Sequence, residues 1–221
     1  ALPHTRDGGR TWQPQTCPPE LQRPFVDVLF LDAERGFAVG AYGLFKVTED
    51  GGATWSELDA PAIRDDELHF NDLIRLGNGD LFIVGETGTM GVSADGRTWE
   101  RLEAPYEGSL YGAIARGERG ALVFGLRGNV YVTEDVRGGD WTQVDTGTVA
   151  SFFGGTRLPD GDAALVGLAG EVALVSPDGS VRLTRIDAIA GVTGSGTLAG
   201  AVPWNGGVLV VGELGVSTVG L

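Results

Sequence analysis

The chain has 221 residues, 37 of them glycine, and a formal net charge of −14. This acidic balance makes nucleic acid and anionic membrane surfaces poor partners, and no apolar run reaches the ~18 residues that a membrane helix needs. Cys17 is the single cysteine, which excludes an internal disulfide and a cysteine-cluster metal site. Aliphatic and aromatic residues are plentiful, so we expect a folded domain rather than a disordered segment.

A short motif recurs five times along the chain. It reads TRDGGRTW at residues 5–12, TEDGGATW at 48–55 and, one residue shorter, SADGRTW at 93–99. A stretched copy, TEDVRGGDW, occupies 133–141, and a shortened copy, SPDGS, occupies 176–180. The first four copies end in tryptophans that lie 43, 44 and 42 residues apart. A fixed period of this kind indicates a repeat architecture.

A second marker follows the same period. An apolar segment ends in Gly-x-x-Gly five times, and the first glycines of these turns lie 45, 40, 42 and 45 residues apart. The glycine pairs are Gly40/Gly43, Gly85/Gly88, Gly125/Gly128, Gly167/Gly170 and Gly212/Gly215. Repeats of ~40–45 residues are typical of β-propeller blades, each of which has four strands.

The second repeat illustrates the four predicted strands. Residues 70–76 form the first strand, and the Asn-Gly-Asp turn at 78–80 follows, because these residue types accept positive φ. Residues 81–84 form the second strand, 89–93 the third and 99–102 the fourth. The Gly-x-x-Gly turn joins the second strand to the third, and the recurring motif joins the third to the fourth.

Counting these strands predicts how the chain closes. The last repeat stops after a third strand at 216–219, and a fourth strand begins near Trp12 with nothing assigned before it. Pairing these two ends would remove two open sheet edges. The predicted fold is therefore all-β, with a single domain over residues 1–221. It is a five-bladed β-propeller of four-stranded antiparallel blades, closed by the N-terminal strand completing the C-terminal blade. The alternative is a piece of a longer propeller.

The repeated motif, Ser/Thr-x-Asp-Gly-Gly-x-Thr-Trp, resembles the Asp box, or BNR repeat. The longer pattern, Gly-Phe-Ala-Val-Gly-x-x-Gly at 36–43 followed by Val-Thr-Glu-Asp-Gly-Gly-x-Thr-Trp at 47–55, is similar to the photosystem II stability and assembly factor-like branch of Asp-box propellers. The resemblance covers essentially the whole chain and implies a role in protein assembly. Relatives of that branch usually have more blades than five. They are often exported, which implies an extracytoplasmic location.

In such families the Asp box is a structural turn, and the residue types agree with that role. Aspartate accepts hydrogen bonds from backbone amides just ahead of it, glycine adopts positive φ, and tryptophan buries a large ring, which we expect between blades. We therefore interpret these residues as structural rather than metal-binding or catalytic: Asp7, Trp12, Asp50, Trp55, Asp95, Trp99, Asp135, Trp141 and Asp178.

Asp-box propellers include sialidases, so a hydrolase is the enzymatic alternative. The nearest match to the arginine motif of those enzymes is Arg-Leu-Pro at 157–159, which falls beside a strand turn. His4 and His69 lack metal-ligand spacing, and no Gly-Lys-Ser/Thr phosphate loop is present. We therefore favour a non-enzymatic protein with no metal and no cofactor. Two-carboxylate glycosidase chemistry stays open, because the sequence has 30 acidic residues.

Strand direction predicts which residues meet on the face away from the Asp boxes, here called the opposite face. The Gly-x-x-Gly turns and the blade-to-blade linkers lie there, and loops on rigid scaffolds carry function. The candidate binding residues are Asp27, Tyr42, His69, Asn71, Asp72, Glu86, Tyr111, Arg127 and Glu213. Counting back thirteen residues from each Gly-x-x-Gly turn places Ala199 of the last repeat at the position of Asp27 and Asp72.

Three functions fit these observations. The leading one is a monomeric scaffold that binds a protein or peptide partner, of basic character because the face is acidic. The second is a glycan-binding or sialidase-like propeller in which exposed aromatics such as Tyr42 or Trp204 stack on sugars. The third is a structural fragment or an engineered propeller without a ligand.

Overall fold

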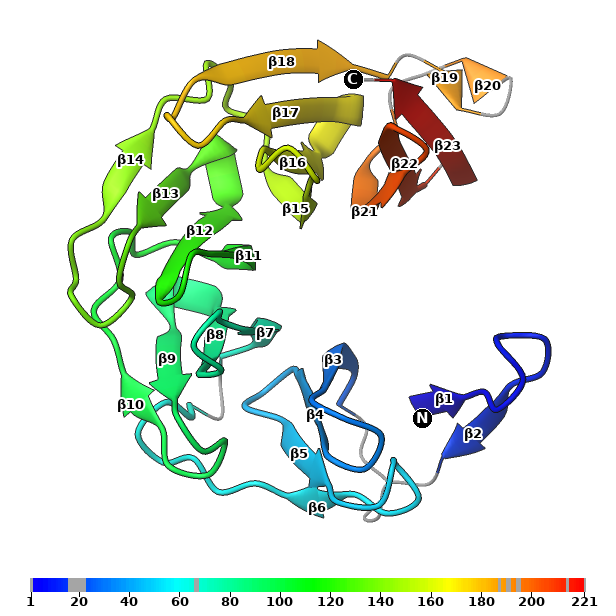
Figure 1. Ribbon diagram of the computed structural model, residues 1–221, viewed down its shortest axis with the longest axis vertical. Coiled ribbons are helices and arrows are strands. Elements are labelled where there is room, and N and C mark those ends of the chain that lie inside the picture. Colours follow the sequence, from blue (N-terminus) through cyan, green and yellow to red (C-terminus); the bar gives the residue numbers. More distant parts are fainter. Residues whose placement is uncertain are drawn as a thin grey trace.

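The computed structural model describes residues 2–15, 23–65, 68–186, 188–189, 192–193, 196–213 and 215–220, and Cys17 lies outside them. Within these residues the protein consists of β-strands and three single-turn 3-10 segments. No helix in this part of the chain is long and apolar enough to cross a membrane. Figure 1 shows the sheets following one another around an arc, with the first strand of each sheet on the inside and the last on the outside.

Four complete antiparallel sheets form the body of the described protein, and each arises from one repeat. The predicted all-β class with four-stranded antiparallel sheets is thereby confirmed. In chain order the strands are, for blade 1, β3 (Phe25–Phe30), β4 (Gly36–Gly40), β5 (Phe45–Thr48) and β6 (Ser56–Glu57); for blade 2, β7 (Phe70–Arg75), β8 (Leu81–Gly85), β9 (Met90–Ser93) and β10 (Glu100–Arg101); for blade 3, β11 (Leu110–Arg116), β12 (Gly120–Gly125), β13 (Val130–Thr133) and β14 (Thr142–Val144); and for blade 4, β15 (Phe152–Arg157), β16 (Ala163–Gly167), β17 (Glu171–Val175) and β18 (Val181–Arg185).

The two ends of the arc are incomplete sheets. At the N-terminal end, β1 (Leu2–His4) pairs with β2 (Gln13–Gln15) in a separate two-stranded sheet, the N-terminal pair. The C-terminal sheet has three strands, β21 (Leu198–Trp204), β22 (Gly207–Gly212) and β23 (Gly215–Gly220). The short strands β19 and β20 form a hairpin of their own before it, and their bounds are Ala188–Ile189 and Val192–Thr193.

The predicted closure is not found among the described residues. The strand count overlooked β1, which precedes the first Asp box as a third strand precedes each of the others. Because β1 already pairs with β2, the N-terminal fourth strand has its partner and does not reach β23. Figure 1 shows the N-terminal pair and the C-terminal sheet on opposite sides of the opening in the arc. The described residues therefore form no closed ring, and the count of five blades stays a prediction.

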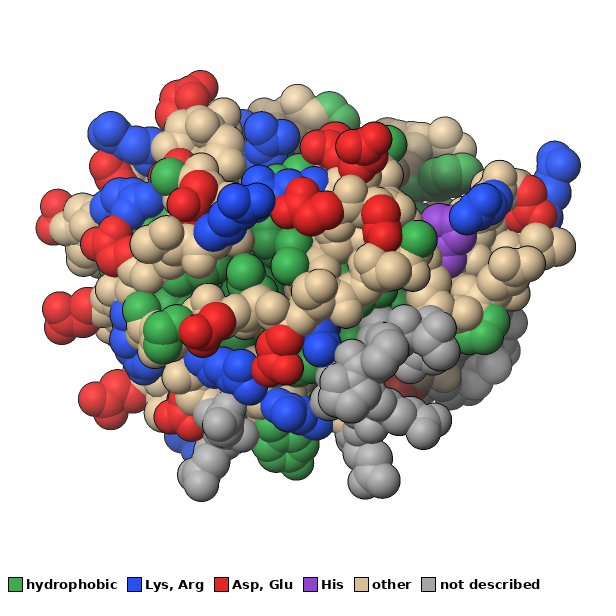
Figure 2. Space-filling model, turned by 90° about the horizontal axis from the view of Figure 1, so that it is seen from below, with side chains coloured by type: hydrophobic (Ala, Val, Ile, Leu, Met, Phe, Trp, Pro, Cys, Tyr) green, Lys and Arg blue, Asp and Glu red, His purple; other side chains and the backbone are tan. Residues whose placement is uncertain are grey.

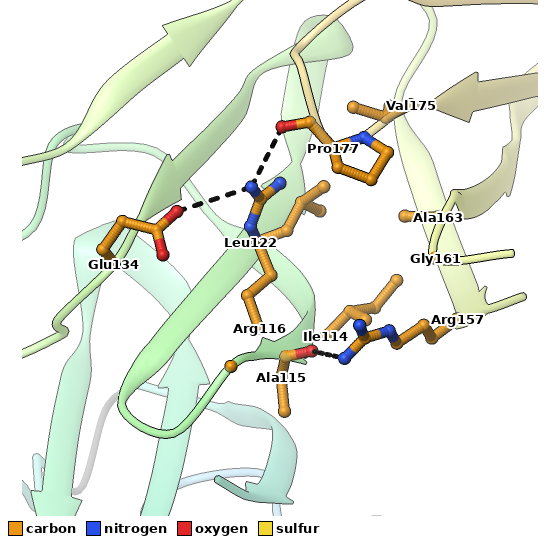
Figure 3. Close-up of a pocket in the computed structure, with 11 residues that line it drawn as sticks. Ile114, Ala115, Arg116, Leu122, Glu134, Arg157, Gly161, Ala163, Val175 and Pro177 are labelled. Atoms are coloured by element: carbon orange, nitrogen blue, oxygen red, sulfur yellow. Dashed lines mark hydrogen bonds and ion pairs between the residues drawn. The ribbon is translucent and has the colours of Figure 1, made fainter. Parts of the chain in front are cut away.

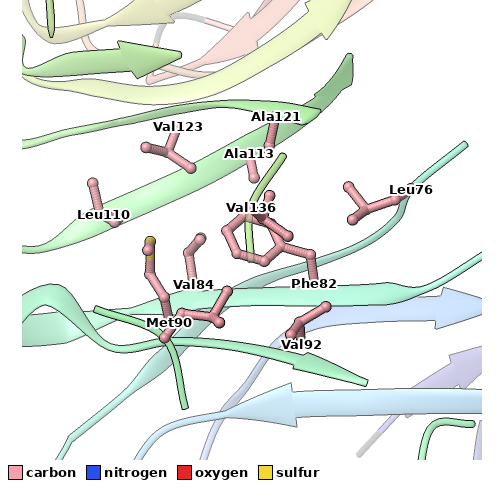
Figure 4. Packing of buried hydrophobic residues seen from close by; sticks show 11 residues of the cluster. Leu76, Phe82, Val84, Met90, Val92, Leu110, Ala113, Ala121, Val123 and Val136 are labelled. Carbon is pink, nitrogen blue, oxygen red and sulfur yellow. The ribbon is translucent and has the colours of Figure 1, made fainter. Parts of the chain in front are cut away.

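The hydrophobic core lies between adjacent blades, and a cluster of this kind occurs at each junction between them. All five residues of β8 are buried, and their side chains alternate between the two neighbouring blades as strand geometry requires. Phe82 and Val84 pack with Leu110 of blade 3 (Figure 4), whereas Leu81 and Ile83 pack in the cluster shared with blade 1. Each interior blade therefore buries both of its faces, which is why the second strands read as continuous apolar runs.

The Gly-x-x-Gly turns bring each blade close to the linker that precedes it. Tyr42, the third residue of the first turn, has a φ of 56°, and the corresponding residues of the next three turns share this left-handed conformation. A Cβ on Gly40 would lie 2.2 Å from the carbonyl oxygen of Pro24, so the close approach requires glycine. The Gly43 N–H donates to the carbonyl of Leu68 at 2.9 Å, which ties the turn to the next linker as well.

Antiparallel pairing places the Asp boxes and the turns after the first strands on one face, called the Asp-box face. Contacts between blades agree with this arrangement. Arg35, after the first strand of blade 1, donates from Nη2 to the carbonyl of Asp95 in the Asp box of blade 2 at 2.7 Å. Arg137, in the Asp box of blade 3, lies 3.2 Å from the carboxylate of Asp80 of blade 2. The Gly-x-x-Gly turns lie at the opposite face.

Candidate functional site

The regular Asp boxes are turns held together by their own carboxylate. Asp50 accepts hydrogen bonds from the Thr54 hydroxyl at 2.6 Å, the Thr54 N–H at 2.8 Å and the Thr48 hydroxyl at 2.8 Å. These bonds favour the charged form and hold the pKa of Asp50 below its usual range. The same bonds, led by that from the Thr11 hydroxyl, lower the pKa of Asp7 to about 2. These carboxylates are therefore engaged by their own turns.

The two irregular copies keep the carboxylate with fewer local partners. Asp135 accepts from the Arg137 N–H at 3.0 Å and lies 2.9 Å from the guanidinium of Arg119. Asp178 accepts from the Ser180 N–H at 2.9 Å. The stretched and shortened boxes thus retain a turn aspartate but lose the threonine partner of the regular copies.

The Asp-box tryptophans differ in exposure according to the strands that pack against them. Trp99 is 6% exposed, and its ring lies 5.3 Å from that of Phe45 in blade 1. Trp141 stacks on Phe82 of blade 2, with ring centroids 6.4 Å apart. Trp12, in the N-terminal pair, is 58% exposed. Trp55 of blade 1 is 5% exposed, with Phe30 of its own blade and Gln15 of the N-terminal pair against it. Burial of this ring thus depends on the strands that pack against it and not on the motif alone.

On the inside of the arc, every first strand has a bulge close to the opposite face. The register shifts occur between Phe25 and Asp27, Phe70 and Asp72, Leu110 and Gly112, Phe152 and Gly154, and Leu198 and Gly200. A bulge of this kind re-aims a side chain. In the last sheet Gly200, rather than Ala199, pairs at the position of Asp27 and Asp72, because this hairpin is one residue shorter. The predicted equivalence was wrong by one residue.

Two carboxyl groups bridge adjacent blades at these bulges. Asp27 accepts from the Leu73 N–H of blade 2 at 3.0 Å, and Asp72 accepts from the Ala113 N–H of blade 3 at 2.8 Å. The amide of Asn71 donates to a carbonyl of β11 at 2.8 Å. Burial, and next the charge of Asp27, raise the pKa of Asp72 to about 7. The pair therefore holds a proton under mildly acidic conditions.

A cavity of about 400 Å³ opens beside these bridging groups. Its polar lining residues are Asp27, Asn71 and Asp72, and its lining also includes the rings of Tyr111 and Phe153, whose centroids lie 5.0 Å apart. Strands β15 and β21 contribute glycine and alanine, whose small side chains leave the space open. Four of the nine predicted binding residues therefore meet at one cavity.

Three further predicted residues form a second group at the turns nearby. His69 Nδ1 lies 2.9 Å from Glu86 Oε2, which also accepts from the His69 N–H at 3.1 Å. The ring of Tyr42 lies 4.8 Å from that of His69, and Arg23 donates to the Tyr42 carbonyl at 2.8 Å. Burial, and then the charge of Glu86, raise the pKa of Tyr111. Glu86 thus connects this group electrostatically to the cavity.

Arg127 and Glu213 make separate contacts at their own turns. The Arg127 N–H donates to the Ser151 hydroxyl at 3.1 Å, and the Arg127 side chain is exposed. Glu213 accepts from the Thr197 N–H at 2.9 Å, which is the contact that Glu86 makes with His69. Neither residue lines the cavity. A glutamate at this turn position thus caps the start of the first strand.

Phe124 lines the cavity, although sequence reasoning did not single it out. It belongs to the second strand β12, where apolar residues are expected in the core. The usable signal is its partner across the sheet, Gly112, because a Cβ there would lie 2.3 Å from the Phe124 ring. Where earlier blades have an aspartate in the first strand, blade 3 has Gly112, and the Phe124 ring fills the space that a side chain would occupy there.

Carboxyl groups and aromatic faces around a cavity are the elements that recognise an ammonium or guanidinium group. Arg127 and Arg157, within the described residues, do not line this cavity, so they do not contribute there to the arginine cluster that a sialidase-like site needs. Away from this cavity, acidic and basic side chains both occur on the surface. Figure 2 shows acidic and basic side chains interspersed on the edge that carries β6.

Comparison with known proteins identifies relatives along most of the chain. The family model for the photosynthesis system II assembly factor YCF48 matches residues 6–180. The photosystem II stability/assembly factor HCF136 of Oryza sativa subsp. japonica is 28% identical over 189 residues, which cover 74% of this chain and 45% of that protein. The photosystem II assembly lipoprotein Ycf48 of Synechococcus sp. (strain CC9902) is 35% identical over 122 residues, 52% of this chain and 35% of the relative. The chain thus spans less than half the length of these two relatives.

Solved structures have the same fold. YCF48 from Cyanidioschyzon merolae superposes with a TM-score of 0.71 at 20% identity, covering 92% of this chain and 69% of that one. A structure described as YCF48 bound to D1 peptide gives a TM-score of 0.69 at 21% identity, covering 87% and 62%. The predicted resemblance is confirmed: the chain belongs to the photosynthesis system II assembly factor YCF48 family.

Proposed function

We propose that the chain is a non-enzymatic scaffold that binds an extended segment of a protein partner on the opposite face. The observation that carries this proposal is the cavity of about 400 Å³ at the inner strands, whose lining includes two carboxyl groups and two aromatic rings. Two relatives are named as photosystem II assembly factors, and one solved neighbour is described as bound to a D1 peptide. Both descriptions support a peptide ligand for this chain.

The chemistry of the cavity favours a basic segment. Asp27 and Asp72 offer carboxyl oxygens, and Tyr111 and Phe153 offer ring faces over which a cation gains about 0.5–2 kcal/mol. Because a bound cation favours the charged form of Asp72, binding below pH 7 should release a proton. The net charge of −14 would also speed the approach of a basic partner at low salt.

Fluorescence anisotropy with two labelled peptides tests this proposal. One peptide is rich in lysine and arginine, and its twin replaces them with glutamate. We expect the basic peptide alone to bind, with affinity that falls at high salt. Asp72→Asn and Glu86→Gln should each weaken binding by roughly three- to tenfold. Glu118→Gln removes one exposed charge from the Asp-box face and should leave binding unchanged.

Two results would contradict the proposal. One is equal binding of the acidic twin. The other is binding of the basic peptide that is as sensitive to Glu118→Gln as to Asp72→Asn, because that pattern reports overall charge and not a site. Capture of oligosaccharides instead of peptides, with loss on Tyr111→Ala, would assign the cavity to the glycan alternative.

A further inference from the structure

A second, smaller cavity lies on the Asp-box face between blade 3 and blade 4 (Figure 3). Its volume is about 120 Å³, and its floor includes Ile114, Leu122 and Val175. Two arginines form its walls: Arg116 ends β11, and Arg157 ends β15. Two cationic groups from neighbouring blades thus face one small space in a chain whose net charge is −14.

Arg116 occupies a position that neighbouring blades give to a buried leucine. The corresponding residues are Leu76 in blade 2 and Leu158 in blade 4, which are 3% and 5% exposed and pack in the cores between blades. A guanidinium at such a junction needs compensating acceptors. The replacement of an apolar side chain by arginine therefore points to a polar role that the repeat itself does not require.

The acceptors that the chain supplies are few and weakly placed. Arg116 donates to the Pro177 carbonyl at 3.2 Å and lies 3.5 Å from the carboxylate of Glu134, whose side chain is 85% exposed. Among the described residues, Arg157 donates to the Ala115 carbonyl alone, at 3.5 Å. Figure 3 shows these contacts at the two sides of the cavity, with the apolar floor between them. Each guanidinium has five N–H donors, so donors outnumber these acceptors.

We propose that this cavity binds the carboxylate of an acidic side chain from a protein partner, held between Arg116 and Arg157. The planar guanidinium matches a carboxylate in paired hydrogen bonds. A volume of about 120 Å³ is well above the ~10–15 Å³ that one water molecule needs, which leaves room for a carboxylate and its methylene groups. This site and the proposed peptide site lie on opposite faces, so the two can be occupied and tested independently.

Calorimetric titration with a blocked Gly-Glu-Gly peptide and its Gly-Gln-Gly twin tests the proposal. We expect weak binding of the glutamate peptide only. Arg157→Gln should weaken it by roughly five- to tenfold, because one charge-assisted partner is lost. Glu134→Gln should strengthen it, because the chain's own competing carboxylate is removed. Arg75→Gln is the matched control: Arg75 occupies the same repeat position as Arg157, in blade 2, and should have no effect.

Inorganic phosphate forms a second arm of the experiment and separates the sources of an anion. Phosphate that binds more tightly than the glutamate peptide, and loses affinity with Arg157→Gln, would overturn the assignment to a carboxylate side chain. Equal binding of the glutamine twin, or equal effects of Arg75→Gln and Arg157→Gln, would overturn the site itself. Because the Arg157 side chain is exposed, we expect the urea midpoint of Arg157→Gln to match the parent.

Discussion

Asp72 shows how one side chain can be both a structural bridge and a binding group. Its carboxyl accepts the Ala113 N–H of the next blade and lines the cavity on the inside of the arc. Burial and the neighbouring Asp27 raise its pKa to about 7, against ~3.9 for an unfolded aspartate. Folding therefore favours the protonated form, and its contribution is complete below about pH 4 and is lost as pH rises through about 7.

Asp72→Asn should consequently gain stability relative to the parent as pH rises. Asparagine keeps an oxygen acceptor for the Ala113 N–H but cannot ionise. Urea unfolding of the parent and the variant at pH 5 and pH 8 gives the free energy of unfolding of each. We expect the value for the variant minus that for the parent to be about 1–3 kcal/mol more positive at pH 8 than at pH 5. Asp59→Asn, an exposed control, should show no such trend. A difference that is the same at both pH values would contradict the assignment.

At the scale of the element, the Asp-box hairpin is a local turn whose effect depends on its surroundings. Asp50 and Asp7 accept nearly the same hydrogen bonds. The turn of Asp50, however, precedes Trp55, which is 5% exposed, whereas the turn of Asp7 precedes Trp12, which is 58% exposed. Identical local chemistry therefore acts on a packed blade in one case and on a solvent-exposed hairpin in the other.

Asp50→Ala should lower the global urea midpoint, and Asp7→Ala should leave it almost unchanged. The pKa of Asp50 is depressed in the folded state, so its contribution is present above about pH 4 and is lost as pH falls through the folded value. The gap between the parent and Asp50→Ala should therefore narrow as pH falls below about 4. Equal losses for the two variants would show that the N-terminal pair unfolds together with the blades.

At the scale of the whole molecule, both ends of the arc expose large apolar side chains, which the junctions between interior blades bury. Phe30 and Val28 in β3 are 43% and 48% exposed, and Trp204 and Val202 in β21 are 53% and 51% exposed. The equivalent of Trp204 in blade 2, Leu76, is 3% exposed because blade 3 covers it. The opening thus follows from incomplete end sheets and not from a change in blade structure.

Deletion of residues 2–15 distinguishes the observed pairing from the predicted closure. Gln15 accepts from the Trp55 indole N–H at 3.1 Å, so the N-terminal pair contacts blade 1. We expect hydrogen exchange to rise in blade 1 near Trp55 and to stay unchanged in β23. Loss of protection confined to β23 would instead show that the N-terminal strand completes the C-terminal sheet in solution.

Particular residues show why the sequence predicted the blades well and the site only partly. Local hairpins depend on residues that are close in the sequence. The spacing of Trp55 and Trp99, and that of the Gly-x-x-Gly turns, therefore indicated them. Asp27 and Asn71 could be placed at the cavity by counting along those hairpins. Phe124 could not be found by counting, because its exposure to the cavity depends on Gly112 across the sheet. Arg127 was predicted at the site but makes its contact elsewhere.

The sequence alone determined the family, the all-β class and the four-stranded repeat, because turn chemistry and alternation of apolar residues are encoded within each ~40-residue segment. The tertiary structure decided the rest. It showed that β1 pairs with β2, that the arc stays open among the described residues, and which polar groups share a cavity. The pairing of β1 with β2 is local, but the open arc and the shared cavity arise from contacts between blades, where residues about 40 positions apart meet, and no pattern within a single repeat records those contacts.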